Sequence, residues 1–79
     1  MADRLTVSDA RNMLNECPRL HSRWTHHSGV VVTVLGCSMD ADTLRPRVHY
    51  EHDGIEWSRP LLEWTANVGS GPRFTEVRE

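Results

Sequence analysis

The segment IEWSRPLLEW, residues 55–64, decides where this chain of 79 residues turns back on itself. Its first letters alternate as a strand, which places Ile55 and Trp57 on one face. Pro60 has a fixed φ and no backbone N–H to donate to a sheet, so the strand must end close to it. Proline also favours an extended backbone at Arg59, the residue before it. We therefore expect a strand that begins at Ile55 and a change of chain direction directly after it.

The letters LLEW that follow the proline predict a tight turn or a single turn of helix. Leu61 and Trp64 are three residues apart, and residues at that spacing share one side of a helical turn. We expect Trp57 and Trp64 to point inward from the two sides of the bend and to close one end of a small core. Large aromatic side chains matter here, because a chain of this length buries only about 60% of the surface that its unfolded form exposes.

The sequence before this bend alternates as further strands. Asp53 and Gly54 form a strong signal for a two-residue hairpin turn. The letters LRPRVHYEH before it predict a strand with Val48 and Tyr50 facing inward. The run VVVTVLG at 30–36 is β-branched and apolar on both faces, which predicts a central strand that is covered on both sides.

Other segments complete the predicted sheet. RWTHHSG at 23–29 leads into the central strand, and RFTEV at 73–77 alternates as a final strand. Two polar segments are predicted to be loops: CSMDADT at 37–43 and GSGP at 69–72.

A short helix is predicted in TVSDARNMLNECP, residues 6–18. Thr6 or Ser8 can cap its start, and Pro18 stops it near Cys17. A helix this short is marginal alone in water, so its apolar stripe must dock on the sheet. That stripe consists of Val7, Ala10, Met13, Leu14 and Cys17.

These elements predict a mainly β fold of the α+β class in one folding unit. An N-terminal helix in residues 1–18 would pack on a small antiparallel sheet, or SH3-like barrel, of about five strands in residues 19–79. The side chains expected to point inward are Met13, Leu14, Trp24, Val32, Val34, Val48, Tyr50, Trp57, Leu61, Trp64 and Phe74.

Composition argues against several classes of protein. Nine arginines and 11 acidic residues give a net charge of −2, so no overall basic excess attracts a phosphate backbone. No apolar run approaches the ~20 residues that span a bilayer, and no stretch has the pattern of a signal peptide. We expect a soluble cytoplasmic protein without a membrane partner. Cys17 and Cys37 are far apart and lack C-x-x-C spacing, which favours two free thiols over a disulfide between them.

Neither a metal site nor an enzyme is predicted. Histidine and cysteine suit zinc, but His49 and His52 would point to opposite faces of a strand. His26 and His27 diverge for the same reason, so surface histidines are favoured. No pattern supplies Cys37 with a base that would lower the thiol pKa. We therefore predict no metal, no cofactor and no catalytic residue.

Four motifs in a fixed order carry a family resemblance. They are W-x-H-x-x-G-x-x-x-x-V-L-G from Trp24, T-L-x-x-x-V-x-Y from Thr43, W-x-R-P-L-x-x-W from Trp57, and P-R-F from Pro72. With these motifs the chain resembles the domain-of-unknown-function family numbered 1653, a family of small bacterial and phage proteins. The resemblance covers residues 24–77 and implies a short β-rich, SH3-like unit. It carries no catalytic residues.

These observations favour a non-enzymatic binding or adaptor module of a bacterium or phage that acts on a protein partner. Small barrels present aromatic-lined grooves to peptides, and tryptophan and arginine are enriched among interface hot spots. Two alternatives stay open: a single-stranded nucleic-acid-binding protein and a phage-encoded inhibitor of a host defence system. The stripe on the helix also leaves a homodimer open. The candidate binding residues are Trp57, Arg59, Trp64, Arg47 and Arg73.

Overall fold

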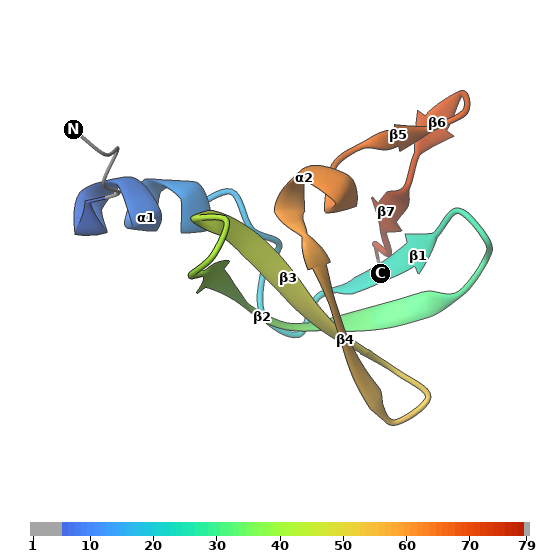
Figure 1. The fold of residues 1–79 in the computed structure, drawn as a ribbon. Coiled ribbons are helices and arrows are strands. Elements are labelled where there is room, and N and C mark those ends of the chain that lie inside the picture. Colours follow the sequence, from blue (N-terminus) through green and yellow to red (C-terminus); the bar gives the residue numbers. More distant parts are fainter. Residues whose placement is uncertain (1–5, 79) are drawn as a thin grey trace.

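The computed structural model describes residues 6–78 (Figure 1). Residues 1–5, which belong to the predicted helical segment, and residue 79 lie outside the described residues. In chain order the elements are α1 (Val7–Leu14), β1 (Arg23–His26), β2 (Val31–Asp40), β3 (Arg45–His52), β4 (Ile55–Pro60), α2 (Leu61–Trp64), β5 (Asn67–Val68), β6 (Gly71–Pro72) and β7 (Phe74–Glu76).

Five of these strands form one antiparallel sheet in the order β4-β3-β2-β1-β7. The first four follow one another as a meander, and the last strand pairs with the free side of β1. The predicted fold class is confirmed at this level, as a mainly β chain with a short N-terminal helix and an antiparallel sheet of five strands. No ladder joins β4 to β7 within residues 6–78, so this sheet is not closed into a barrel.

Both predicted turns around β4 are confirmed. Asp53 and Gly54 have φ angles of 57° and 74°, the left-handed conformation that a two-residue hairpin turn requires. The Glu51 carboxylate accepts the Gly54 N–H at 2.7 Å and braces this turn. After the strand, α2 brings Leu61 and Trp64 into the core as expected.

β2 is longer than predicted, because it continues to Asp40 through most of the segment 37–43 that was expected to be a loop. A β-bulge lies between Val34 and Gly36. Gly36 has a φ of 148°, which residues with a side chain rarely adopt. The extra residue shifts the alternation, so Cys37 faces the core. The other predicted loop, at 69–72, is also partly strand, because β5 and β6 pair there as a small hairpin.

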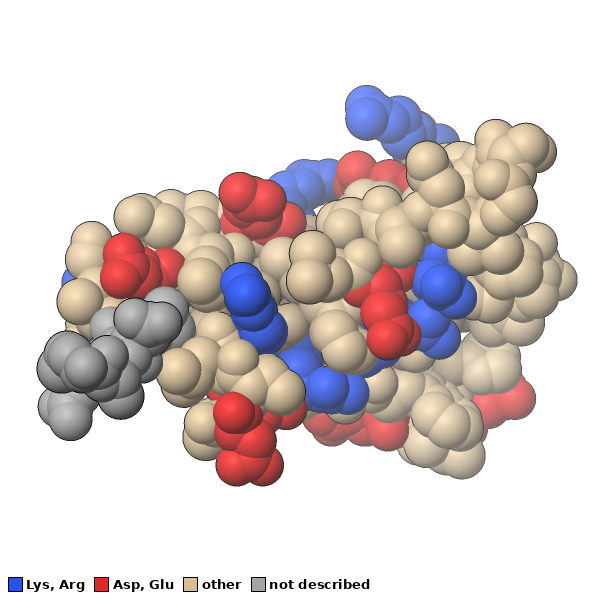
Figure 2. Space-filling view, turned by 45° about the horizontal axis from the view of Figure 1, so that its top comes forward, with Lys and Arg blue, Asp and Glu red and all other residues tan. Residues whose placement is uncertain are grey.

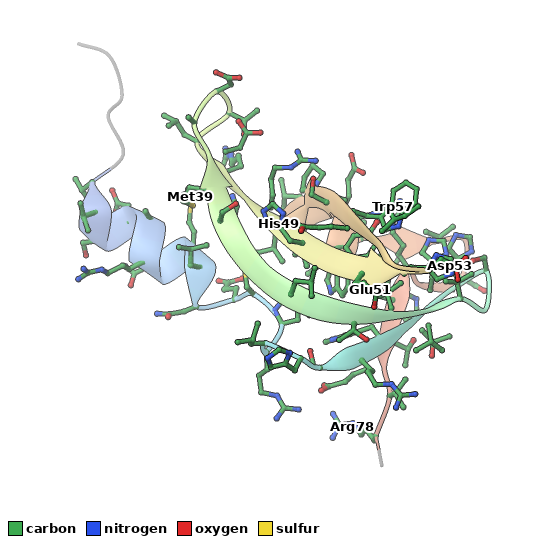
Figure 3. All side chains as sticks on the ribbon, turned by 90° about the horizontal axis from the view of Figure 1, so that it is seen from below. Met39, His49, Glu51, Asp53, Trp57 and Arg78 are labelled. Carbon is green, nitrogen blue, oxygen red and sulfur yellow. The ribbon has the colours of Figure 1, made fainter. Side chains whose placement is uncertain are left out.

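The outer face of β2 is not covered, so the prediction that this strand is covered on both sides is wrong. Val31 and Leu35 are 42% and 37% exposed. The neighbouring positions on β3 are polar, and Figure 3 shows His49 and Glu51 among them. A helix laid over this face would have to bury those groups as well, which is unfavourable without partners.

α1 instead lies beyond one end of the sheet, beside β2 and β3 (Figure 1). The Thr6 hydroxyl accepts the Asp9 N–H at 3.0 Å, which confirms the predicted cap. None of the residues of α1 is fully buried. Met13 and Leu14 are half-buried, so the helix docks less deeply than its stripe predicted.

The core forms on the inner, concave face of the sheet. Trp64 stacks on Phe74 with ring centroids 3.8 Å apart, and the half-buried Trp24 meets Trp64 edge-on at 5.6 Å. These aromatic contacts supply much of the packing energy that so few residues can provide. The buried hydrophobic residues are Val32, Val34, Val48, Tyr50, Leu61, Trp64 and Phe74, all of which were predicted to point inward.

Candidate functional site

A shallow groove on the inner face of the sheet lies near the β3–β4 hairpin, and we call it the aromatic groove. Its volume is about 200 Å³. It combines aromatic rings with cationic or titratable nitrogen groups, which is a combination typical of recognition surfaces. The residues that line it are His26, Ser28, Val30, Val32, Tyr50, His52, Trp57, Arg59 and Phe74.

Trp57 is the most exposed aromatic side chain of this groove, and the prediction that it is buried is wrong. It is 46% exposed. Trp57 pairs directly with Tyr50, and directly opposed residues share a face, so its predicted inward direction is confirmed. It stays exposed because β4 is an edge strand and the β3–β4 hairpin projects beyond the core (Figure 1). The indole N–H donates to the His52 carbonyl at 3.4 Å, which orients the ring.

Arg59 lies two residues further along β4 on the same face. Its guanidinium carbon is 5.5 Å from the centroid of the Phe74 ring, and its Nε donates to the Tyr50 hydroxyl at 3.4 Å. These contacts hold a half-buried cation between the Phe74 ring and the Tyr50 hydroxyl. No carboxylate oxygen of residues 6–78 lies within 4.0 Å of this guanidinium.

His26 forms the far wall of the groove. Its Nδ1 accepts the Ser28 N–H at 3.2 Å, and its ring meets Phe74 edge-on at 5.0 Å. Burial lowers the pKa of His26, and the positive charges of His27, Arg59 and Arg73 lower it further. This imidazole therefore favours its neutral form.

The other three predicted binding residues lie outside the aromatic groove. Trp64 is 3% exposed and belongs to the core. Arg73 does not line the groove, and its Nε donates to the Glu63 carbonyl at 2.9 Å. Arg47 is on the outer face, where it donates to the Ser58 hydroxyl and lies 3.8 Å from an Asp40 carboxylate oxygen.

A second groove is cationic and has no Phe, Tyr or Trp among its described lining residues; we call it the basic groove. Its volume is about 490 Å³. Arg19 is bound there to Glu76 at 2.8 Å. Figure 2 shows acidic and basic side chains interspersed over one face of the molecule rather than gathered by sign. The residues that line the basic groove are Arg19, His21, Ser22, Arg23, Glu76, Val77 and Arg78.

His26 was predicted to lie on the surface, and Tyr50 and Phe74 were predicted to lie in the core. The sequence did not predict that all three line one groove. A signal for Tyr50 was present. A two-residue turn at Asp53 and Gly54 sets Tyr50 opposite Trp57, so their contact follows from the hairpin alone. No comparable local signal brings Phe74 to Arg59, because that contact depends on the curvature of the whole sheet.

Comparison with known proteins gives no match for this chain among protein-family models, curated proteins or solved structures. The resemblance to the family of unknown function therefore stays a prediction.

Within residues 6–78, no helix has the length and apolar character needed to cross a membrane. The same residues include no cluster of three or more His, Cys, Asp or Glu side chains that could hold a metal ion.

Proposed function

We propose that this chain is a non-enzymatic protein-binding module whose aromatic groove receives an extended peptide segment that carries an acidic residue. The observation that carries this proposal is the pairing of an exposed indole, Trp57, with a cation, Arg59, that has no carboxylate partner among the described residues.

The aromatic part of the groove supplies the apolar contact. A small domain has few large side chains for its core, yet Trp57 and Ile55 leave 46% and 52% of their surfaces exposed on the same edge strand. Exposed apolar surface of this kind, rimmed by polar groups, is typical of interaction sites. A partner that covered Trp57 would gain the burial of an indole that is already oriented by its hydrogen bond to His52.

The charge of the groove selects the partner. Arg59 is pre-organised by Tyr50 and Phe74, so it can donate to a carboxylate with little further loss of side-chain freedom. The volume of about 200 Å³ fits one or two side chains of a peptide. An acidic residue beside an apolar one matches this arrangement.

We also propose that the sheet is a half-open, SH3-like barrel, as the family resemblance implies. Strands in a flat sheet lie about 4.8 Å apart, so the two edges of a five-stranded sheet would be roughly 19 Å apart. Arg59 on β4 and Phe74 on β7 are in contact at 5.5 Å across those edges. Although two long side chains bridge part of this separation, the contact supports a curled sheet, and no ladder joins the two strands in the described residues.

Single-stranded nucleic acid is the second candidate ligand, because the basic groove carries arginines. A binder of single strands combines a positively charged groove with aromatic stacking platforms. Here the two features are separated, because the basic groove and the aromatic groove share no residue. The net charge of −2 also opposes non-specific binding to phosphates. These observations favour the protein partner.

The test is a fluorescence-anisotropy titration of the full chain with short labelled peptides. One peptide carries glutamate beside leucine, and its matched partner carries glutamine in place of glutamate. We expect the acidic peptide to bind more tightly, and Trp57→Ala and Arg59→Gln each to weaken binding at least tenfold. Leu62→Ala and Arg45→Gln, which change exposed residues outside the groove, serve as controls. Equal binding of the two peptides, or tighter binding of a labelled single strand, would count against the proposal.

A further inference from the structure

β4 lies at one edge of the five-stranded sheet, and within residues 6–78 no strand pairs with its open side. Residues 55–58 of this strand are all exposed. The strand at the other edge, β7, has three residues and begins with the buried Phe74. β4 is therefore the edge that offers the longer accessible stretch of backbone.

The register of the β3–β4 hairpin decides which backbone groups of β4 are already used. His52 and Ile55 are the pair next to the turn at residues 53–54, and residues that flank a two-residue turn exchange hydrogen bonds. Hydrogen-bonded and non-hydrogen-bonded pairs alternate along an antiparallel ladder. Trp57 and Arg59 therefore direct their backbone N–H and C=O groups toward β3.

The alternate residues, Glu56 and Ser58, direct their backbone N–H and C=O groups to the open side of the sheet. No other backbone group of residues 6–78 pairs with them there. Pro60 occupies the next position of this set, so its missing N–H costs the ladder no hydrogen bond. Glu56 and Ser58 thus present donors and acceptors at the spacing of a β-ladder.

We propose that the peptide partner binds by strand addition and pairs antiparallel with the open side of β4. This inference rests on the proposed function, because the same peptide places its side chains in the aromatic groove. Ser58 would exchange two backbone hydrogen bonds with the peptide residue opposite it. Glu56 would do the same with the residue two positions further along the peptide.

The inner face of β4 then sets the order of residues in the peptide. Trp57 and Arg59 both line the aromatic groove. In an antiparallel partner, the residue opposite Arg59 comes two positions before the residue opposite Trp57. Side chains two positions apart share one face of a strand. The matching peptide therefore has an acidic residue, then any residue, then an apolar residue, as in Glu-x-Leu.

A second copy of this chain is a poorer occupant of this edge. The side chains that β4 directs to the inner face are Ile55, Trp57 and Arg59, and none of them is acidic. Pairing of two β4 strands would therefore leave Arg59 without a carboxylate opposite it on that face. Charge complementarity favours a different chain that carries an acidic residue.

The experiment compares backbone-methylated peptides in the anisotropy titration of the full chain. The parent is a short labelled peptide with one Glu-Ala-Leu segment. N-methylation of its alanine removes the N–H that would donate to the Ser58 carbonyl, so we expect binding to weaken roughly tenfold. N-methylation of its leucine, whose N–H would point away from β4, is the matched control and should leave binding unchanged. Equal binding of the two methylated peptides, or tighter binding of a Leu-Ala-Glu peptide, would overturn the proposal.

Hydrogen exchange of single amides, followed by NMR, separates this inference from the proposed function. In the free chain the Trp57 and Arg59 amides should be protected by β3, whereas the Glu56 and Ser58 amides should exchange freely. Saturation with the Glu-Ala-Leu peptide should protect Glu56 and Ser58. If the acidic peptide binds and these two amides stay unprotected, strand addition is wrong and the proposed function stands. Protection of these amides in a dimer that forms without peptide would also overturn the inference, and failure of every acidic peptide to bind would overturn the proposed function itself.

Discussion

The guanidinium of Arg59 lies 5.5 Å from the centroid of the Phe74 ring, although their strands stand at opposite edges of the five-stranded sheet. The contact spans the inner face, and Figure 3 shows the curvature of β2 and β3 that makes it feasible. It also positions the cation of the aromatic groove. One interaction thus connects the shape of the sheet to the proposed binding chemistry.

Arg59→Ala should lower the free energy of unfolding by about 1 kcal/mol, because it removes a half-buried cation–π contact and a hydrogen bond to Tyr50. Urea unfolding followed by circular dichroism measures the change. Arg45→Ala, which removes an exposed arginine at the start of β3, is the matched control and should stay within about 0.5 kcal/mol of wild type. Equal stability losses in the two variants would show that the Phe74 contact is not energetically significant.

The two tryptophans of the segment IEWSRPLLEW should respond very differently to the same substitution. Trp64 is buried against Phe74, so Trp64→Ala should destabilise the fold by about 3–5 kcal/mol. Trp57 is half exposed, so Trp57→Ala should cost about 1 kcal/mol and leave a folded protein. Thermal unfolding resolves the difference, since 1 kcal/mol shifts the midpoint of so small a domain by roughly 4–8 °C. If the Trp57→Ala variant were unfolded, the assignment of Trp57 as an exposed groove residue would be wrong.

Stability should fall as the pH drops below about 6.5, and His26 should contribute to that fall. Its pKa is lowered in the folded state by burial and by the charges of His27, Arg59 and Arg73. The unfolded chain then binds more protons than the folded chain, so stability rises with pH across this window. Protonation would also remove the Ser28 N–H bond to Nδ1. His26→Gln should flatten the stability–pH curve between pH 7 and pH 5, and an unchanged slope would refute the assignment.

The bulge in β2 should depend on glycine at one position. Gly36 has a φ of 148°, and nothing lies within 4 Å of an added Cβ, so Gly36→Ala would suffer from backbone strain alone. We expect a loss of about 1–2 kcal/mol. Gly71→Ala is the matched control, because its site is equally open and its φ is not in the positive range. If both variants were as stable as wild type, the bulge would not need glycine.

The sequence predicted what depends on local chemistry. Pro60 marked the end of β4, Asp53 and Gly54 marked the hairpin, and the spacing of Leu61 and Trp64 placed both in the core. These signals are read over a few residues and do not require knowledge of the rest of the fold.

What the sequence did not predict depends on contacts that are remote in the chain. Residues 37–43 were predicted to be a loop because they are polar, whereas β2 continues past the bulge at Gly36 to Asp40. The exposure of Trp57 depends on the position of β4 at the edge of the sheet. Periodicity alone contains none of this information.

The most direct test of the central proposal is a map of the bound surface by amide chemical shifts. The isotope-labelled full chain is titrated with the glutamate-containing peptide, and backbone amide and indole N–H signals are followed. We predict that the largest shifts fall on the Trp57 indole, on β4 and on the loop from His26 to Val30. Shifts confined to the basic groove around Arg19 and Arg78 would contradict the proposal that the peptide binds in the aromatic groove. The absence of shifts at peptide concentrations that saturate the anisotropy signal would contradict it as well.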